Sequence, residues 1–426
     1  MYRRQFIAWS AASMSALTVS ASAFAQLNVD VTGVGLTQIP IMIVPLRGEQ
    51  LLDVNISSVV QADLKRSGMF HPMSVDVTMD ESTDVNYSEW KQLGADALAV
   101  GSVNQRTDGQ YEIRIRLWDI ATNRELGSQV FIAAAADLRL AAHRIADFIF
   151  EKLTGYKGAF ASRIAYVTQN GANHNLVIAD SDGERPRIAL NSSQPIISPS
   201  WSPDGTQLAY VSFEMQKPVI YVHSLSTGQR RIIANYRGSN SAPAWSPNGQ
   251  QIAATLTLSG LSQIYLLSSA TSGSPRRLTN TSGIDTQPKF SADGQYIYFV
   301  SDRGGNPQIY RMPASGGAAQ RVTFNSNYSV DPALSPDGKW LAYIANDGGR
   351  FHLQLQNLET GQTQSLTDTS MDSTPSFAPN SMMIMYATRV GGRDTLITTT
   401  LDGQVKTRLS NANANIKEPV WGPYLN

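Results

Sequence analysis

Histidine, cysteine and closely spaced carboxylates, the side chains that most often carry chemistry, are sparse in this sequence. The five histidines are His71, His143, His174, His223 and His352, and no two of them lie within seven residues. Metal motifs on one element need ligands at closer spacing, so we interpret each histidine as structural or exposed. Cysteine is absent, which excludes disulfides, thiolate metal sites and a lipid-modified N-terminal cysteine.

Catalytic motifs of defined spacing are missing as well. The sequence holds no G-x-S-x-G, no H-E-x-x-H and no phosphate-binding G-x-x-x-x-G-K. The segment Asp180-Ser181-Asp182-Gly183-Glu184 resembles half of a calcium loop. It lies where other repeats carry a Thr-Gly turn, so we interpret it as a turn. The sequence therefore predicts no cofactor, while lyase or glycosidase chemistry based on carboxylates stays open.

The carboxylates that do recur belong to an internal repeat. A five-residue phrase, first met at Trp201-Ser202-Pro203-Asp204-Gly205, returns with its first residue at positions 245, 290, 334, 377 and 421, at spacings of 43 to 45. Each of the first five phrases is followed by an apolar run typical of a buried strand, a further strand, a glycine turn and a more polar strand. Units of this length with four strands each are typical of β-propeller blades.

Six units predict six blades, and the two ends of the repeat region predict a closed ring. The first unit, beginning near Ile164, lacks its innermost strand, whereas the last phrase at Trp421 has only that strand. We therefore expect residues 418–424 to complete the first blade. The fold class is thus an α/β N-terminal domain followed by an all-β six-bladed β-propeller closed by the C-terminal strand.

The repeated phrase has a structural explanation. Ser, Pro, Asp and Gly in this order favour a type I turn with a left-handed glycine, joining strands a and b of each blade. The aromatic residue before it is expected to pack between blades. The proline two residues earlier, as at Pro199, is expected to begin the innermost strand. Specific contacts should then come from the loops of the opposite face, which join strands d to a and b to c.

Acidic residues recur in the d–a loops and would form a rim at the mouth of the channel. They are Asp285, Asp331, Asp372 and Glu418. Two interpretations stay open for them: they cap strand ends and turns, or they bind a partner.

The region before the ring, residues 26–158, predicts an α/β domain. A strand over 39–44 precedes a helix whose apolar face runs from Leu52 to Leu64, and a short helix follows over 88–93. Strands are expected over 97–103, 111–120 and 128–134. Asp137 is expected to cap a long helix that ends at Gly155. Residues 156–161 form the linker, and the propeller is assigned to 159–426.

Residues 1–25 have the pattern of an export signal. Arg3 and Arg4 form a basic start, an apolar stretch follows, and cleavage is expected between Ala25 and Gln26. The pair of arginines leaves the Sec and Tat routes both open. Without this segment 32 basic residues stand against 34 acidic ones, a net charge of −2 that does not favour nucleic-acid binding. A soluble periplasmic or secreted protein is expected.

The first mature residues alternate apolar and polar, with Leu27, Val29 and Val31 on one side. The pattern is typical of a short strand. Either it forms an edge of its own domain or it pairs with another protein. Composition and position alone favour the domain edge.

The whole mature chain resembles the TolB family of periplasmic Tol–Pal components. The resemblance rests on the repeats P-x-[WF]-S-P-D-G and LAYVS, on Ile43-Val44-Pro45, on the segment from Asp63 to Phe70, and on the terminus Lys417-Glu418-Pro419 to Leu425. Departures are small, such as Ala292 where the phrase has proline.

This resemblance implies an adaptor that is not an enzyme. It implies binding of the lipoprotein Pal at the propeller, binding of TolA by the mature N-terminus, contacts with other envelope proteins, and a part in outer-membrane integrity and constriction during division. The Pal surface it implies consists of Ser239, Ala242 and Thr286, with the rim residues Asp285, Asp331, Asp372 and Glu418 nearby. The TolA segment it implies is Gln26, Leu27, Asn28, Val29, Asp30, Val31, Thr32 and Gly33, which reverses the preference for a domain edge. The alternatives are a periplasmic propeller hydrolase or lyase acting on polysaccharide or peptide, and a rigid scaffold for the first domain.

Overall fold

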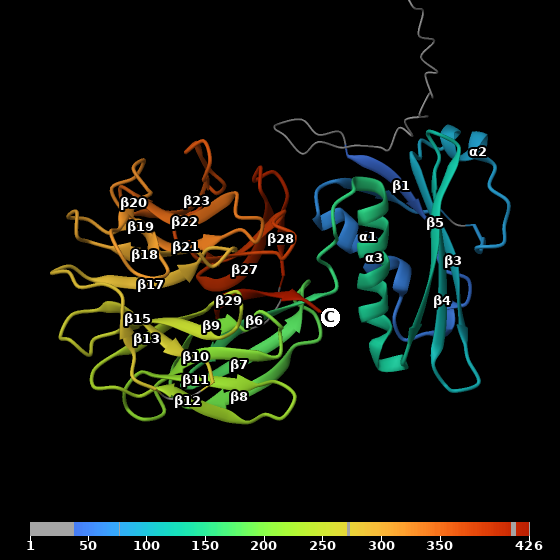
Figure 1. Ribbon diagram of the computed structural model, residues 1–426. Helices are drawn as coiled ribbons and strands as arrows, with labels where there is room; N and C mark the ends of the chain where they lie inside the picture. Colours follow the sequence, from blue (N-terminus) through green and yellow to red (C-terminus); the bar gives the residue numbers. More distant parts are fainter. Residues whose placement is uncertain (1–37, 76, 271–272, 410–414, 426) are drawn as a thin grey trace, which may run out of the picture.

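The structure, a computed structural model, describes residues 38–75, 77–270, 273–409 and 415–425. The predicted signal peptide, its cleavage site and the predicted TolA segment 26–33 lie outside the described residues. An α/β domain stands beside a β-propeller, and helices α1 and α3 lie between the sheet of the first domain and the ring (Figure 1).

The N-terminal domain is built on one five-stranded sheet in the order β2-β1-β3-β4-β5. β1 pairs in parallel with β2 and β3, and the remaining pairs are antiparallel. Its elements are β1 (Ile39–Ile43), the 3-10 turn Glu49–Leu51, α1 (Ile56–Arg66), β2 (Phe70–Met73), α2 (Tyr87–Gln92), β3 (Ala97–Gln105), β4 (Tyr111–Asp119), β5 (Arg124–Ala133), the 3-10 turn Ala135–Asp137 and α3 (Leu138–Thr154).

Both faces of this sheet are covered by apolar side chains. α1 and α3 bury residues such as Ile56 and Ile145 against one face, while Trp90 of α2 packs with Trp118 on the other. The alternating and 3.6-residue patterns of the sequence produce this arrangement, because each element presents one apolar side to the sheet.

Helix boundaries follow local capping with two differences from expectation. The Asn55 side chain accepts a hydrogen bond from the Ser58 amide at 2.8 Å, so α1 begins after Leu52. Asp137 stands at the start of α3 as the last residue of the 3-10 turn, but its side chain makes no capping hydrogen bond. Gly155 ends α3 in the left-handed conformation, as predicted. Strand β2 was not predicted from the sequence.

The ring has six four-stranded blades, as the repeat predicts. From inner to outer strand they are β29 (Asn415–Tyr424), β6 (Ser162–Asn170), β7 (Asn173–Asp180) and β8 (Arg187–Ser192); β9 (Ile196–Trp201), β10 (Gln207–Ser212), β11 (Val219–Ser224) and β12 (Arg230–Ala234); β13 (Asn240–Trp245), β14 (Gln251–Leu256), β15 (Gln263–Ser268) and β16 (Arg276–Arg277); β17 (Asp285–Phe290), β18 (Tyr296–Ser301), β19 (Gln308–Pro313) and β20 (Gln320–Arg321); β21 (Ser329–Leu334), β22 (Trp340–Asp347), β23 (Arg350–Asn357) and β24 (Thr363–Ser365); β25 (Ser373–Phe377), β26 (Met383–Val390), β27 (Arg393–Thr400) and β28 (Lys406–Arg408).

The repeated phrase forms the expected a–b turn. In the second blade the Gly205 amide donates to the Ser202 carbonyl at 2.9 Å, and Gly205 is left-handed with φ 68°. The Ser202 hydroxyl donates to Asp204 at 2.5 Å and accepts from the Gln207 amide at 2.9 Å. Trp201 reaches the neighbouring blade, where its indole donates to the Val420 carbonyl at 3.2 Å. The repeated phrase therefore has a structural role in the ring.

Closure of the ring by the C-terminal strand is confirmed. β29 pairs antiparallel with β6, with Trp421 opposite Ile164 and Tyr424 opposite Ser162. The first blade thus combines strands from the two ends of the propeller segment, which Figure 1 shows as red and green ribbons side by side.

The prolines of the innermost strands occupy a different place from the one predicted. β9 begins at Ile196, so Pro199 lies inside the strand at a register shift rather than at its start. The residue before each such proline has a positive φ between 48° and 54°, namely Ser198, Ala242, Gln287, Asp331, Thr374 and Glu418. A non-glycine residue in this conformation costs on the order of 1–3 kcal/mol, so the sequence pattern alone did not suggest it.

The N-terminal domain contacts the face of the ring that carries the a–b and c–d turns. Arg66 of α1 donates to the Ser181 carbonyl in the c–d turn of the first blade at 2.8 Å. Asn380, in the a–b turn of the sixth blade, donates to the Lys157 carbonyl of the linker at 3.2 Å. The opposite face, with the d–a and b–c loops, is therefore left uncovered by residues 38–158 as far as the structure describes them.

Candidate functional site

We call the face of the propeller with the d–a and b–c loops the free face. It carries exposed apolar side chains on three consecutive d–a loops. Ile284 is 49% exposed, Phe324 is 69% exposed and Met371 is 51% exposed. We call these three residues the apolar loop set. Exposing large apolar side chains to water is unfavourable, and a few such residues can serve as anchors for a protein partner. The sequence analysis missed this set, although each is an apolar residue inside an otherwise polar loop.

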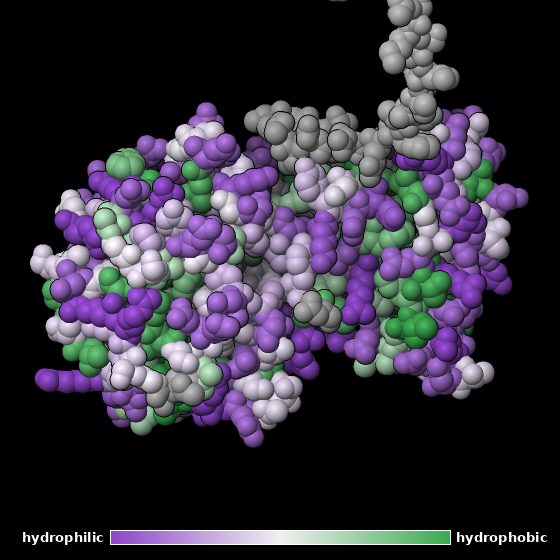
Figure 2. Space-filling view, viewed as in Figure 1, coloured by the Kyte–Doolittle hydropathy of each residue, from purple (hydrophilic) through white to green (hydrophobic). Residues whose placement is uncertain are grey.

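The b–c loops of the same face add further exposed apolar residues. They are Met215, Leu258 and Leu261, all more than 40% exposed. Polar residues lie between these groups, as expected for a protein-binding surface with a mixed composition. On the side of the molecule that Figure 2 shows, most surface residues of both domains are hydrophilic, and apolar residues form separate small groups.

Asp285, one of the predicted rim residues, is enclosed within its blade. Its carboxylate accepts from Arg303 at 2.8 Å and from the Thr281 hydroxyl at 3.1 Å, and the residue is 0% exposed. A carboxylate in such a place is paired because burying an unpaired charge is costly. Asp285 therefore holds the d–a loop that presents Ile284.

Asp372 is enclosed in the same way, in the d–a loop between the fifth and sixth blades. It accepts from the hydroxyls of Thr369 and Thr388, both at 2.6 Å, and from the Leu353 amide at 3.2 Å. With 3% exposure its side chain does not reach the surface. Its position directly after Met371 again makes it a support for an exposed apolar residue.

Asp331 and Glu418 line the channel at the left-handed positions. Each accepts a hydrogen bond from the backbone of the next blade: Asp331 from the Thr374 amide at 3.0 Å, and Glu418 from the Ser198 amide at 3.1 Å. The Gln287 side chain accepts a hydrogen bond from the Asp331 amide in the same way, at 3.0 Å. Side chains at this position therefore join neighbouring blades around the channel mouth.

One cation lies in the same channel layer. The charges of Asp331 and Glu418 act on Lys289, two residues beyond Gln287 on β17. Burial lowers the pKa of Lys289, and burial together with the Asp331 charge raises the pKa of Glu418. Both shifts favour neutral forms, which reduces the charge inside the channel.

The three neutral residues of the predicted site also lie on the free face, in partly exposed positions. The Ser239 amide donates to the Thr257 hydroxyl at 2.7 Å, and Thr286 accepts from Thr255 at 3.3 Å. Ala242 is the left-handed residue of its blade, with φ 49°. The structure thus brings Ser239, Ala242, Thr286, Asp331 and Glu418 to one end of the ring, with Asp285 and Asp372 buried beneath it.

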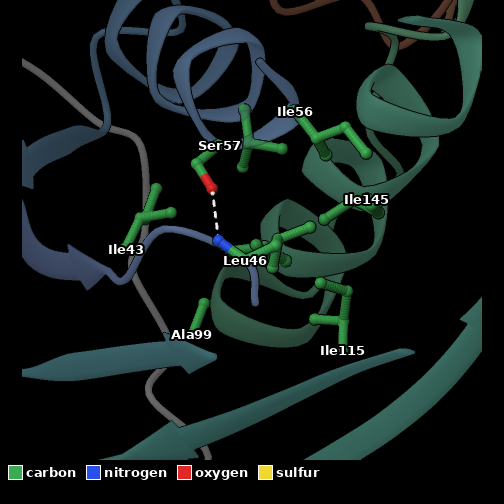
Figure 3. Close-up of a pocket in the computed structure, with 9 residues that line it drawn as sticks. Ile43, Leu46, Ile56, Ser57, Ala99, Ile115 and Ile145 are labelled. Carbon is green, nitrogen blue, oxygen red and sulfur yellow. Dashed lines mark hydrogen bonds between the residues drawn. The ribbon is translucent and has the colours of Figure 1, made fainter. Parts of the chain in front are cut away.

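A small cavity lies within the N-terminal domain, between α1, α3 and the sheet (Figure 3). Its volume is about 10 Å³, and its lining is apolar except for Ser57. The Ser57 hydroxyl is already engaged, accepting from the Leu46 amide at 3.1 Å and donating to Glu49 at 2.9 Å. A space of this size is at the limit for one water molecule, so it does not serve as a substrate pocket.

One group of possible metal-binding atoms occurs among the described residues. Asp63, His143 and Asp182 place one ligand atom each within 4.8 Å of one another. However, Arg66 and Arg139 already form ion pairs with the two carboxylates. The guanidinium groups of these two arginines thus neutralise the charge that a metal ion would neutralise. Asp63, His143 and Asp182 are better described as part of a buried ion-pair network.

Within the described ranges, no helix has the length and apolar character needed to cross a membrane. The fold and the uncovered loop face together define a two-domain β-propeller protein with an N-terminal α/β domain. Comparison with known proteins gives the same description. Residues 150–425 match the family "TolB beta propeller domain", and residues 27–126 match "TolB amino-terminal domain".

Relatives match over nearly the full length. The Tol-Pal system protein TolB of Polaromonas sp. (strain JS666) is 57% identical, covering 96% of this chain and 97% of its own. That of Bordetella pertussis is 45% identical, covering 96% and 94%. The crystal structure of TolB from Acinetobacter baumannii superposes with a TM-score of 0.85 at 37% identity, covering 91% of this chain and 97% of its own. The chain belongs to the TolB family of Tol-Pal system proteins.

Proposed function

We propose that this protein is a periplasmic adaptor of the Tol-Pal system that binds the lipoprotein Pal on the free face of its propeller. The observation that carries the proposal is the apolar loop set, Ile284, Phe324 and Met371, on the face that the N-terminal domain leaves uncovered. Interface energy concentrates in a few apolar and aromatic anchors surrounded by polar residues. Ser239, Ala242, Thr286, Asp331 and Glu418 supply such polar or small surroundings.

The second half of the proposal concerns the mature N-terminus. Gln26 to Gly33 would bind TolA as an added strand, because their alternating pattern suits pairing with an exposed sheet edge. The protein would then connect two partners from its two ends and serve outer-membrane integrity and constriction during division. It would do so without catalysing a reaction, in keeping with the missing catalytic motifs.

Calorimetric titration of the soluble domain of Pal into the mature chain tests the first half. Phe324→Ala and Met371→Ala should each weaken Pal binding by about tenfold or more, as expected for interface anchors. The matched control is Ile188→Ala, because Ile188 is 61% exposed but lies on the outer strand β8. Undiminished binding by both loop variants would reject this surface.

A titration of the TolA C-terminal domain tests the second half. Deleting residues 26–33 should abolish TolA binding while Pal binding persists, since the Pal surface lies on the propeller. We further propose that Pal binding alters the availability of this segment. Equal TolA affinity with and without saturating Pal would remove that coupling, without affecting the two binding sites themselves.

A further inference from the structure

The junction between the two domains contains a buried network of charged side chains. Arg66 of α1 donates to the Ser181 carbonyl at 2.8 Å and to its hydroxyl at 2.6 Å. The Ser181 hydroxyl in turn donates to the Phe160 carbonyl of the linker at 2.7 Å. Arg139 of α3 forms an ion pair with Asp182 of the same turn. The c–d turn of the first blade is therefore held by both helices.

His143 of α3 lies at the centre of this network and is 1% exposed. Its Nδ1 is 2.5 Å from Oδ2 of Asp63. A carboxylate only accepts, so Nδ1 carries a proton that it donates to Asp63. The other ring nitrogen, Nε2, makes no hydrogen bond and lies 3.9 Å from Oδ2 of Asp180 and 3.8 Å from Oδ2 of Asp182. Oδ2 of Asp180 is also buried without a hydrogen bond.

The protonation state of Nε2 decides whether His143 attracts the carboxylates of Asp180 and Asp182. A lone pair on Nε2 would face two carboxylates, whereas an Nε2 proton would give the ring a positive charge beside them. Coulomb interactions are strong in a site from which water is excluded. The same atoms therefore attract across the domain junction in one protonation state and lose that attraction in the other.

All elements around His143 contribute charged groups. The carboxylates are Asp63 on α1, Asp147 on α3, and Asp180 and Asp182 on the propeller, and the guanidinium groups are Arg66, Arg139 and Arg185. Asp180 and Asp182 are the groups that face Nε2, and an ionised carboxylate beside this nitrogen favours the protonated ring.

We propose that this junction is a proton-dependent latch, in which doubly protonated His143 holds Asp180 and Asp182 of the first blade against α1 and α3. Loss of the Nε2 proton weakens the hold between the N-terminal domain and the propeller. The direction of the pKa shift of His143 agrees with a protonated ring. Burial lowers this pKa, but the charges of Asp63 and Asp182 and the hydrogen bond to Asp63 outweigh burial and raise the pKa above its ordinary value.

The direction of the effect follows from linkage. Asp63 lies in the same domain as His143, so the difference between the open and closed junction comes from Asp180 and Asp182 of the propeller. Because the pKa of His143 is therefore higher in the closed junction than in the open one, closing is most favourable below the pKa of the open junction. That contribution is lost as pH rises through the raised value. Each unit of difference between the two pKa values changes the closing equilibrium by about tenfold.

Hydrogen exchange of the full mature chain measures the latch directly. Backbone amides in residues 157–162 and 180–184 would be followed between pH 5.5 and 8.5 in the presence of a chelator, with rates corrected for intrinsic exchange. In the wild type, protection of these segments should fall by about tenfold or more as His143 titrates. His143→Gln should remove this dependence above pH 7, where Asp147, whose pKa is about 6 and which accepts from the Phe160 and Ala161 amides, is already ionised. His71→Gln should retain it because His71 is exposed.

A second measurement keeps the proposal testable if His143→Gln folds poorly. The pKa of His143 is followed by NMR in the wild type and in Asp180→Asn, which keeps the size of the side chain and removes the charge facing Nε2. The pKa should fall in the variant. An unchanged pKa in Asp180→Asn, or a wild-type protection that differs from that of His143→Gln by the same factor at every pH, would overturn the latch.

Discussion

The indole Nε1 of Trp421 donates a hydrogen bond to the Ser162 hydroxyl at 2.8 Å, across 259 positions of sequence. Ser162 also donates to the Ala159 carbonyl in the linker at 2.6 Å. Close by, the Lys157 ammonium lies 3.8 Å from the centre of the Tyr424 ring. The C-terminal strand therefore closes the ring and fastens the linker of the N-terminal domain at one place.

Deletion of residues 417–426 should open the ring. Loss of a buried tryptophan alone costs about 3–5 kcal/mol, so the melting temperature should fall by about 10 °C or more. Trp421→Phe serves as the graded comparison, because it keeps an aromatic ring at this position while removing the indole N–H and some buried volume, at a cost of about 1 kcal/mol or more. A truncated chain with the melting temperature of the full-length protein would refute closure.

Two equivalent glycines should differ in their tolerance of alanine. Gly183 and Gly228 both have positive φ in c–d turns, at 86° and 69°. An added Cβ at Gly183 would lie 2.1 Å from the Leu409 carbonyl oxygen, whereas at Gly228 it would meet nothing within 4 Å. Gly228→Ala should cost about 1–2 kcal/mol from conformation alone, and Gly183→Ala clearly more. Denaturant unfolding measures both, and equal costs would contradict the tight contact between the first and sixth blades.

The carboxyl group of Asp147 should make stability depend on pH. It accepts from the Phe160 and Ala161 amides at 2.7 and 3.0 Å, but burial still raises its pKa to about 6. Since the folded pKa exceeds the ordinary value of 3.8, its stabilising contribution is complete below that value and is lost as pH rises through about 6.

The variant Asp147→Asn isolates this contribution. The free energy of unfolding of the wild type should fall relative to that of the variant between pH 4 and 7, as measured by denaturant titration at each pH. Asp84→Asn is the matched control, because Asp84 is exposed. A difference between wild type and Asp147→Asn that is constant with pH would show that Asp147 does not titrate in this range.

Asp331 should matter for the stability of the ring. Asp331→Ala removes the acceptor of the Thr374 amide and leaves a non-glycine residue at positive φ. An unsatisfied amide costs about 1–3 kcal/mol. Asp331→Asn should cost less, because its side-chain oxygen still accepts and asparagine tolerates this conformation. Chemical unfolding of both variants provides the test, and a neutral Asp331→Ala would mean that solvent satisfies the amide.

The architecture of the propeller could be predicted from the sequence because the repeat is a local pattern. The spacing from Trp201 to Trp421 predicted the number of blades, and the missing inner strand at Ile164 predicted where the ring closes. Pairing of β2 with β1 was not predictable in the same way, since Phe70 and His71 show no alternating pattern of their own.

The site was only partly predictable, for physical reasons. Asp285 and Asp372 look like surface acids in a polar loop, and only their partners, such as Arg303 and Thr388, show that they are buried. The left-handed conformation at Asp331 depends on contacts between neighbouring blades. The docking of Arg66 on Ser181 joins residues 115 positions apart, and no local pattern reports such a contact.

The pairing of β29 with β6 also has a consequence for biosynthesis. As the chain is made from its N-terminus, β6 is among the first propeller strands to appear and its inner partner is the last. Until then one edge of the first blade offers unpaired backbone groups, which other chains can pair with. A prematurely terminated chain that lacks β29 therefore keeps an exposed strand edge in its first blade.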